Sequence, residues 1–227
     1  MPATTLTFSH VSFTYPDGTE ALRDVSFSIC PGEKVALMGS NGAGKSTLLL
    51  HCNGLLLPNK GVVRVGEMEV MKSTLREVRA KVGMLFQNAD DQLFMPTVEE
   101  DVAFGPRNMQ LPEDEVEKRV TEALHTVGSE ALRNRACHRL SGGQKRMVAI
   151  AGVWTMQPEV WVMDEPATGL DAEARECFIQ IVASLPTTCL IATHDFSLAH
   201  RLCSRIIYLE EGCLQSDCKV VKNQLPG

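Results

Sequence analysis

A glycine-rich run that ends in lysine and serine is the first feature of this sequence that could do chemistry. Residues 39–46 fit the pattern Gly-x-x-x-x-Gly-Lys-Ser/Thr. Such glycines let the backbone curl so that its N–H groups surround phosphate oxygens, and a following helix adds its positive end. Lys45 is expected to neutralise the terminal phosphates of a nucleotide, and the Ser46 hydroxyl to bind Mg²⁺. The predicted phosphate-binding residues are Gly39, Ser40, Asn41, Gly42, Ala43, Gly44, Lys45, Ser46 and Thr47.

Two adjacent carboxylates, Asp164 and Glu165, directly follow a short apolar run. That run, 160–163, is what a parallel strand covered on both faces looks like. Ligands of open α/β sheets bind beyond the carboxyl ends of such strands. Asp164 is therefore placed to hold Mg²⁺ through its water shell, and Glu165 to orient and polarise an attacking water. The alternative, a turn cap, is weakened by Pro166 and by the glycine-rich loop upstream.

These groups need a sheet to position them, and the apolar patterns predict one. The expected strands are 6–13, 22–29, 34–38, 61–65, 82–86, 160–163, 188–192 and 205–209, with a terminal hairpin at 211–212. Helices are expected from 45 to about 54, from 112 to 128 and from 141 onward, and in the remaining intervals. The pattern indicates one α/β domain, 1–227. Its core would be 1–87 and 158–227, and a helical subdomain, 88–157, would be inserted.

The composition limits the classes of partner. The chain has 227 residues and a net charge of −6, which disfavours a nucleic-acid partner because phosphate backbones need a basic patch. No apolar run approaches the roughly 18 residues of a membrane span, and the N-terminus lacks a signal-peptide pattern. A membrane would then be reached through a partner. The cysteines form no Cys-x-x-Cys pair, so we expect buried, reduced thiols in the cytosol.

The run Leu140-Ser141-Gly142-Gly143-Gln144 narrows the class. Ser141 and Gln144 have the spacing of a capping box, which presents N–H groups and a positive helix end to an anion. With the loop and the acidic pair, this run makes the chain resemble the ABC ATPase family over nearly its whole length. The resemblance implies ATP and Mg²⁺ as cofactors. It also implies a P-loop ATPase core with a mainly parallel sheet, a small antiparallel β subdomain and an inserted α-helical subdomain.

The same resemblance implies a head-to-tail dimer in which Ser141, Gly142, Gly143 and Gln144 face the γ-phosphate held by the other subunit. A P-loop kinase is disfavoured by this run. A GTPase is disfavoured as well, because Asn59-Lys60 lacks the aspartate of a guanine-reading motif.

Further residues match family elements in order along the chain. Tyr15 resembles the aromatic that stacks on adenine, although a core aromatic beside a turn is a rival interpretation. Gln87 resembles the glutamine that senses Mg²⁺ and the membrane partner. Gly169-Leu170-Asp171 resembles the loop that communicates across the dimer, and Asp171 is also placed to cap a helix. His194 resembles the switch histidine on the γ-phosphate. The implied catalytic residues are Lys45, Gln87, Glu165 and His194, and the implied metal-site residues are Ser46, Gln87 and Asp164.

A narrower resemblance comes from 86–94, from 97–106 and from Gln144-Lys145-Arg146 with the apolar run after it. These segments resemble energy-coupling-factor importers, the cobalt and nickel type among them. Two departures are Ala167-Thr168, an inverted order, and the end of the sequence at Gly227, which leaves the stabilisation of a dimer open. The resemblance implies an ATPase at the cytoplasmic face of the cell membrane. It would pair with itself or a related subunit and drive integral membrane subunits; a vitamin importer or a soluble ABC ATPase are the alternatives.

The segment from Asn88 to Pro106 is expected to be the docking surface for the membrane partner. It carries Leu93, Phe94 and Met95 among acidic residues and follows Gln87 directly. Apolar anchors with a charged rim suit a reversible interface. The alternative is an acidic, solvated loop whose apolar residues pack inward.

Overall fold

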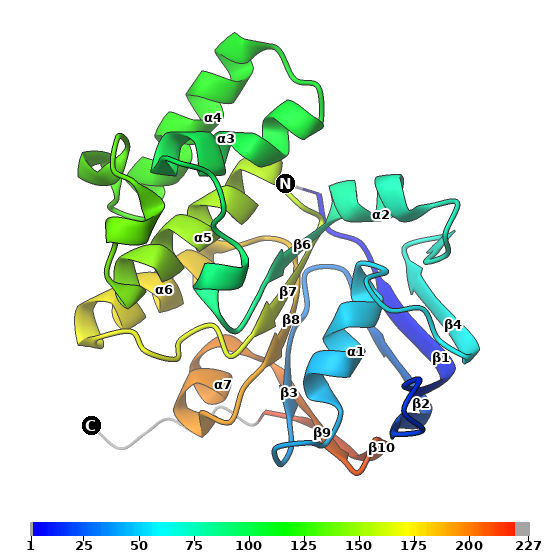
Figure 1. The fold of residues 1–227 in the computed structure, drawn as a ribbon. Coiled ribbons are helices and arrows are strands. Elements are labelled where there is room, and N and C mark those ends of the chain that lie inside the picture. The colour runs from blue at the N-terminus through cyan, green and yellow to red at the C-terminus, as the bar shows by residue number, and fades with distance from the viewer. Residues whose placement is uncertain (1, 221–227) are drawn as a thin grey trace.

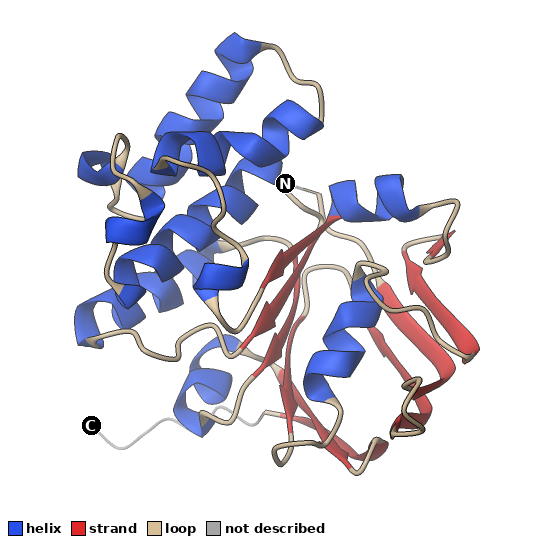
Figure 2. Cartoon of the chain, in the orientation of Figure 1, coloured by secondary structure: helices blue, strands red, loops and turns tan. Residues whose placement is uncertain are grey.

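Two β-sheets form the frame of the molecule in the computed structural model, which describes residues 2–220 (Figures 1 and 2). The strands of the larger sheet are β3 (Lys34–Met38), β6 (Val82–Leu85), β7 (Val160–Asp164), β8 (Thr188–Ala192), β9 (Arg205–Glu210) and β10 (Cys213–Lys219). Its order is β10-β9-β3-β8-β7-β6; β10 is antiparallel to its neighbour and the other pairs are parallel. This is the mainly parallel sheet that the sequence predicts.

The smaller sheet is antiparallel, as expected. Its strands are β1 (Leu6–Thr14), β2 (Glu20–Ile29), β4 (Lys60–Val65) and β5 (Met68–Glu69), in the order β2-β1-β4-β5. Every predicted strand is present, with boundaries that differ by a few residues, and the predicted terminal hairpin is β9 and β10.

The helices connect these strands and cover the sheets. They are α1 (Lys45–Cys52), α2 (Leu75–Lys81), α3 (Val98–Asn108), α4 (Glu113–Thr126), α5 (Gly142–Met156), α6 (Ala172–Ser184) and α7 (Phe196–Leu202). Short 3₁₀ turns lie at Ala89–Asp91, Glu130–Leu132 and Cys137–Arg139. Helix α1 lies between the sheets, in contact with β2 and β4 of one and β7 and β8 of the other. Figure 1 shows α3 to α6 on the opposite side of the larger sheet from α1 and the smaller sheet.

The helices α3, α4 and α5 pack on one another and form most of the 88–157 segment. The apolar spacing that predicts α4 is the buried stripe of that helix, made of Val116, Val120, Ala123 and Leu124. Helix α3 was not expected as such. It begins at a capping box between Thr97 and Glu100, whose Ser/Thr-x-x-Glu spacing is present in the sequence. Much of the predicted docking surface is therefore helical.

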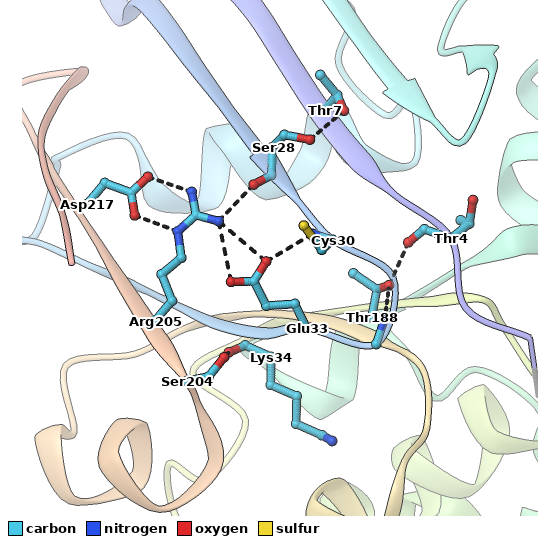
Figure 3. Close-up of polar contacts among 11 residues, drawn as sticks. Thr4, Thr7, Ser28, Cys30, Glu33, Lys34, Thr188, Ser204, Arg205 and Asp217 are labelled. Carbon is cyan, nitrogen blue, oxygen red and sulfur yellow. Dashed lines mark hydrogen bonds and ion pairs between the residues drawn. The ribbon is translucent and has the colours of Figure 1, made fainter. Parts of the chain in front are cut away.

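A partly buried arginine joins the two sheets (Figure 3). Arg205 of β9 donates through Nη1 to the carbonyl oxygen of Ser28 in β2 (2.8 Å) and pairs with Asp217 of β10 and with Glu33. The hydrogen bonds to Asp217 hold the pKa of Arg205 above its usual value. A charge that is this well paired ties β2 to the edge of the parallel sheet, and so fixes the smaller sheet beside the ends of β3 and β9.

Two other expectations concern membranes and thiols. Among residues 2–220, no helix combines the length and the apolar character needed to cross a bilayer. Cys52, Cys137, Cys189 and Cys203 are buried, as predicted. Cys30 and Cys218 are exposed, which corrects the expectation, because they lie at the end of β2 and on the edge strand β10. Residues 221–227 of the predicted core lie outside the described part of the chain.

Candidate nucleotide site

A cavity of about 840 Å³ opens where several parallel strands end. The glycine-rich loop follows β3, the acidic pair ends β7, His194 follows β8, and Gln87 follows β6. Because β3, β8, β7 and β6 are neighbours in that order, the residues after them meet at one edge of the sheet. The predicted residues that line the cavity are Tyr15, Gly39, Ser40, Asn41, Gly42, Gly44, Lys45, Ser46, Thr47, Gln87, Asp164, Glu165 and His194. Ala43, the remaining residue of the loop, is buried.

The glycines of the loop hold a backbone that other residues would not fit. Gly39 has φ +151°, and a Cβ there would lie 2.0 Å from the carbonyl oxygen of Leu209. Gly44 has φ +101°, and its Cβ would lie 2.5 Å from the carbonyl oxygen of Ala21. Gly44 is also the residue before α1, so the N–H groups of the first helical turn face the loop. The sequence therefore folds locally into a cradle for an anion.

Lys45 is buried at the start of α1, and its ammonium group lies over this cradle. Its Nζ donates to the carbonyl oxygens of Gly39 (2.8 Å) and Ser40 (2.9 Å). A lysine ammonium has three donors, so one remains for an oxygen of a ligand. The positive charge and the inward N–H groups fit the phosphates of a nucleotide.

Asp164 is buried beside Ser46. Burial raises the pKa of the Asp164 carboxyl, the hydrogen bond from Ser46 and the charge of Lys45 oppose that rise, and the neighbouring Glu165 adds to it. A divalent cation next to this carboxylate would offset the cost of burying it. Residues 2–220 contain no group of three or more His, Cys, Asp or Glu side chains that could hold a metal alone. The oxygens of Ser46 and Asp164 fit Mg²⁺ as it binds beside phosphates, with few protein ligands.

Glu165 has an unusual backbone and well-defined partners. Its φ is +43°, a value that non-glycine residues rarely adopt, and its N–H donates to the carbonyl oxygen of Ala192 (2.9 Å). One carboxylate oxygen lies 2.8 Å from Nδ1 of His194, and the other accepts a hydrogen bond from the Thr193 hydroxyl (3.3 Å). The carboxylate is thus fixed at the cavity wall with 11% of its side chain exposed, whereas the histidine is 74% exposed.

Tyr15 is half-buried in the cavity wall, so it is neither a core aromatic nor a fully exposed one. Its ring contacts Phe13 edge-on with 4.9 Å between centroids, and its hydroxyl lies 3.0 Å from Oγ1 of Thr47. The ring lines the cavity, so the position fits an aromatic wall for a base.

Two polar side chains near Gln87, one buried and one partly buried, were not recognised from the sequence as part of the site. Arg146 of α5 is 4% exposed and donates to the carbonyl oxygens of Phe86 and Gln87. Burial lowers the pKa of this guanidinium. Gln92 accepts from the N–H of Phe86 (3.3 Å) and donates to the carbonyl of Ala149 (3.1 Å). The available signal was a basic residue directly before the apolar run of α5, where a charge that is buried must find partners.

The run at Ser141 does not line this cavity. The predicted capping box is present: Gln144 N–H donates to the Ser141 hydroxyl (3.2 Å), and Ser141 N–H donates to the Gln144 side chain (3.0 Å). Ser141 and Gly142 are exposed at the start of α5. Asp171 is also exposed and caps α6 by accepting from Ala174 N–H (2.9 Å), as predicted. Within one chain these groups therefore stand apart from the phosphate loop.

The docking segment differs in part from the expectation. Phe94 is 63% exposed, whereas Leu93 is partly buried against the core. Asp101, expected at an acidic rim, is buried instead. Its Oδ2 accepts from the N–H groups of Phe94 (2.9 Å) and Met95 (2.7 Å) and lies 3.6 Å from the Cys137 thiol.

Comparisons with known proteins agree with this geometry. The family model described as ABC transporter matches residues 22–168. A putative ABC transporter ATP-binding protein of Geobacter sulfurreducens is 55% identical over 89% of this chain and 82% of its own length. The energy-coupling factor transporter ATP-binding protein EcfA of Methanothermobacter thermautotrophicus is 51% identical over 89% of this chain and 67% of its own.

Solved structures are similar over the whole described fold. CbiO1 of Clostridium perfringens, part of the ABC transporter complex CbiONQ, has a TM-score of 0.83 and 38% identity, covering 94% of this chain and 88% of its own. The bacterial ABC transporter cassette MJ0796, solved as a dimer, has a TM-score of 0.87 and 30% identity, covering 96% of this chain and 100% of its own. A post-hydrolysis dimer of that cassette is bound to ADP and Pi.

Proposed function

Because this chain belongs to the ATP-hydrolysing subunits of ABC transporters, of the energy-coupling-factor type, we propose that it drives import of a transition-metal ion, cobalt or nickel. It would do so at the cytoplasmic face of the cell membrane, bound to integral membrane subunits. The observation that carries the ATPase assignment is the meeting of Lys45, Asp164 and Glu165 in one cavity. The metal class rests on the likeness of segments 86–94 and 97–106 to importers of that type. A vitamin importer is the second candidate.

The residues of the cavity divide the chemistry among themselves. The loop N–H groups and Lys45 bind the phosphates. Ser46, Asp164 and Gln87 would hold Mg²⁺, which would supply positive charge to the phosphates. Glu165 orients the attacking water and accepts its proton. His194 contacts the Glu165 carboxylate and lines the same cavity, so it would contact the terminal phosphate of bound ATP. Tyr15 stacks on the base.

A second chain would complete each site. Ser141 and Gly143 lie at a capped helix start outside their own cavity, where free N–H groups can reach a phosphate held by a partner. The partner is a second copy or a related ATPase subunit. A mixed dimer tests this arrangement, with Lys45→Ala in one chain and Ser141→Arg in the other. Both lesions then fall in one site and leave the other whole. Activity above that of either mutant alone supports the head-to-tail geometry; no rescue, with dimers present, contradicts it.

We also propose that the segment from Asn88 to Pro106 receives the membrane subunits. Phe94 and Met95 line a hollow of about 350 Å³ together with Lys145 and His138. The exposed ring of Phe94 packs edge-on against Phe104, at 4.7 Å between centroids. Arg146 bonds the carbonyls of Phe86 and Gln87, so the nucleotide cavity and this hollow share one helix. A change at the nucleotide cavity when ATP binds or is hydrolysed can therefore be transmitted to the hollow through α5.

The experiment for this function is isolation of the chain with its membrane partners, followed by uptake in vesicles. We expect co-purification with integral membrane proteins and ATP-dependent uptake of Co²⁺ or Ni²⁺. Uptake of a vitamin but no metal would select the second candidate. Recovery with soluble partners alone would overturn the transport assignment.

Replacing Phe94 and Met95 by Ser should impair assembly and uptake but leave hydrolysis by the isolated chain near normal. Exposed Phe196, on α7, gives a matched control as Phe196→Ser.

A further inference from the structure

A closed circuit of side chains lies behind the tyrosine wall of the cavity. Tyr15 packs edge-on against Phe13 (4.9 Å, 83°), and Phe13 packs edge-on against His51 (4.9 Å, 78°). His51 Nδ1 lies 2.7 Å from the carbonyl oxygen of Thr47, and the Thr47 hydroxyl lies 3.0 Å from the hydroxyl of Tyr15. The circuit thus begins and ends at Tyr15. It joins the end of β1 to the phosphate-binding helix α1.

His51 is the least expected member of this circuit. It is fully buried on α1, and its Nε2 has no hydrogen-bond partner among the described residues. The Thr47 carbonyl can only accept, so Nδ1 carries the proton and Nε2 carries the unpaired lone pair. Burial also lowers the pKa of the imidazole, which keeps the ring neutral. A leucine, like those around it on α1, would fill the space without an orphaned nitrogen.

The imidazole supplies two things that a leucine lacks. The Nδ1–H bond to the helix backbone fixes the plane of the ring, since it ties a second atom of the side chain to α1. The fixed plane then presents a flat partner to the edge-on ring of Phe13, which in turn sets the angle of Tyr15. Every other contact in the circuit depends on Tyr15 or Phe13 being already in place.

We propose that His51 is a positioning residue that holds Tyr15 in its base-binding orientation. It would thereby determine how much the base of ATP adds to the binding affinity of the phosphates. This inference rests on the proposed stacking of Tyr15 on the base. If His51 instead only fills space in the core beside α1, a different outcome is expected. Helix α1 begins with Lys45 and Ser46, so loosening the helix as a whole would weaken the phosphate contacts as well.

The test separates the base from the phosphates. Dissociation constants for ATP and for inorganic triphosphate are measured by calorimetry on the full chain, and their ratio gives the contribution of the nucleoside. In His51→Leu we expect the preference for ATP over triphosphate to fall about three- to tenfold, the size of one aromatic pair, with triphosphate affinity unchanged. His51→Phe keeps a flat edge-on partner for Phe13 but lacks the Nδ1–H bond that fixes the plane of the ring, so it should recover only part of the preference. Cys52→Ala, a buried change on the same helix, is the matched control and should keep the ratio.

The possible outcomes distinguish this inference from the function it rests on. Equal weakening of ATP and triphosphate in His51→Leu would assign His51 a structural role and overturn the proposal. The proposal also fails if Tyr15→Ala lowers the ratio and His51→Leu does not. If Tyr15→Ala itself leaves the ratio unchanged, Tyr15 does not stack on the base, and the proposal for His51 is contradicted as well. Should His51→Leu not fold, His51→Gln, which also lacks the ring, carries the same expectation.

Discussion

Strand ends build the nucleotide cavity, whereas buried and partly buried polar side chains hold the helical segment 88–157 in place. In the cavity, the phosphate loop begins directly after β3, and Gln87, the acidic pair and His194 lie at or just after the ends of β6, β7 and β8, whose neighbouring positions bring them together. In the helical segment, Arg146 and Gln92 bond backbone groups 57 to 60 residues away, and Asp101 accepts from two N–H groups of the preceding turn. A change in the cavity should therefore alter chemistry and leave the fold intact. A change at one of these polar links should do the reverse.

The sharpest test of the cavity is Glu165→Gln. The amide keeps the size of the side chain and cannot accept a proton from water, so hydrolysis should fall by about 10²- to 10⁴-fold. ATP binding should persist, because Lys45 and the loop are unchanged, and we expect a closed dimer to accumulate with ATP. Phosphate release and gel filtration measure the two effects. Normal turnover in this variant would contradict the role assigned to Glu165. A large loss of thermal stability would contradict the expectation that changes in the cavity leave the fold intact.

Lys45→Ala should act on binding itself. Loss of a charge-assisted contact to phosphate costs about 1.5–3 kcal/mol, or roughly one to two decades in the dissociation constant of ATP. Calorimetric titration measures it. Lys34→Ala is the matched control, because Lys34 donates to the carbonyl oxygen of Leu185, away from the cavity, and its loss should leave ATP affinity unchanged. Equal ATP affinity in Lys45→Ala and wild type would contradict the phosphate-loop assignment.

The difference between the regions also explains what the sequence could predict. The loop at 39–47, the carboxylates after β7 and the capping box at Ser141 are contiguous motifs, so their local structure was predicted correctly. Parallel strands then brought Gln87 and His194 to the same cavity, because residues that follow neighbouring strands meet at one edge.

The polar links of the helical segment escaped prediction for a physical reason. Asp101 was expected at a solvated rim because five acidic residues occur in its neighbourhood, and nothing local marks which of them is buried. Its partners are the N–H groups of a turn six and seven residues earlier and a thiol 36 residues later. Arg146 likewise reaches 59 and 60 residues back. Such pairs depend on the packing of α3 and α5, which single-sequence periodicity does not specify.

Asp101→Ala tests the helical segment directly. The change leaves the N–H groups of Phe94 and Met95 without their acceptor, which should reduce the free energy of unfolding by about 1–3 kcal/mol. Hydrolysis by the isolated chain at a temperature below its transition should stay near normal. Asp101→Asn keeps an acceptor oxygen and should cost less. Urea unfolding and phosphate release measure both quantities. If Asp101→Ala impaired hydrolysis while stability stayed intact, the division between the regions would be wrong.

The smallest expected effect concerns His51, which lies behind the cavity wall and is buried like Asp101 and Arg146 of the helical segment. Burial lowers its pKa in the folded chain below the ordinary 6.5. The unfolded chain therefore takes up a proton first as pH falls below about 6.5, and the stability present above that pH is lost progressively until the folded-state pKa is passed. This loss cannot exceed about 1.4 kcal/mol per pH unit. Urea unfolding at pH 7.5 and 5.5 should show a smaller loss in His51→Phe than in wild type. Because the other five of the six histidines remain in both proteins, the difference isolates the buried ring, and equal losses would contradict a lowered pKa of His51.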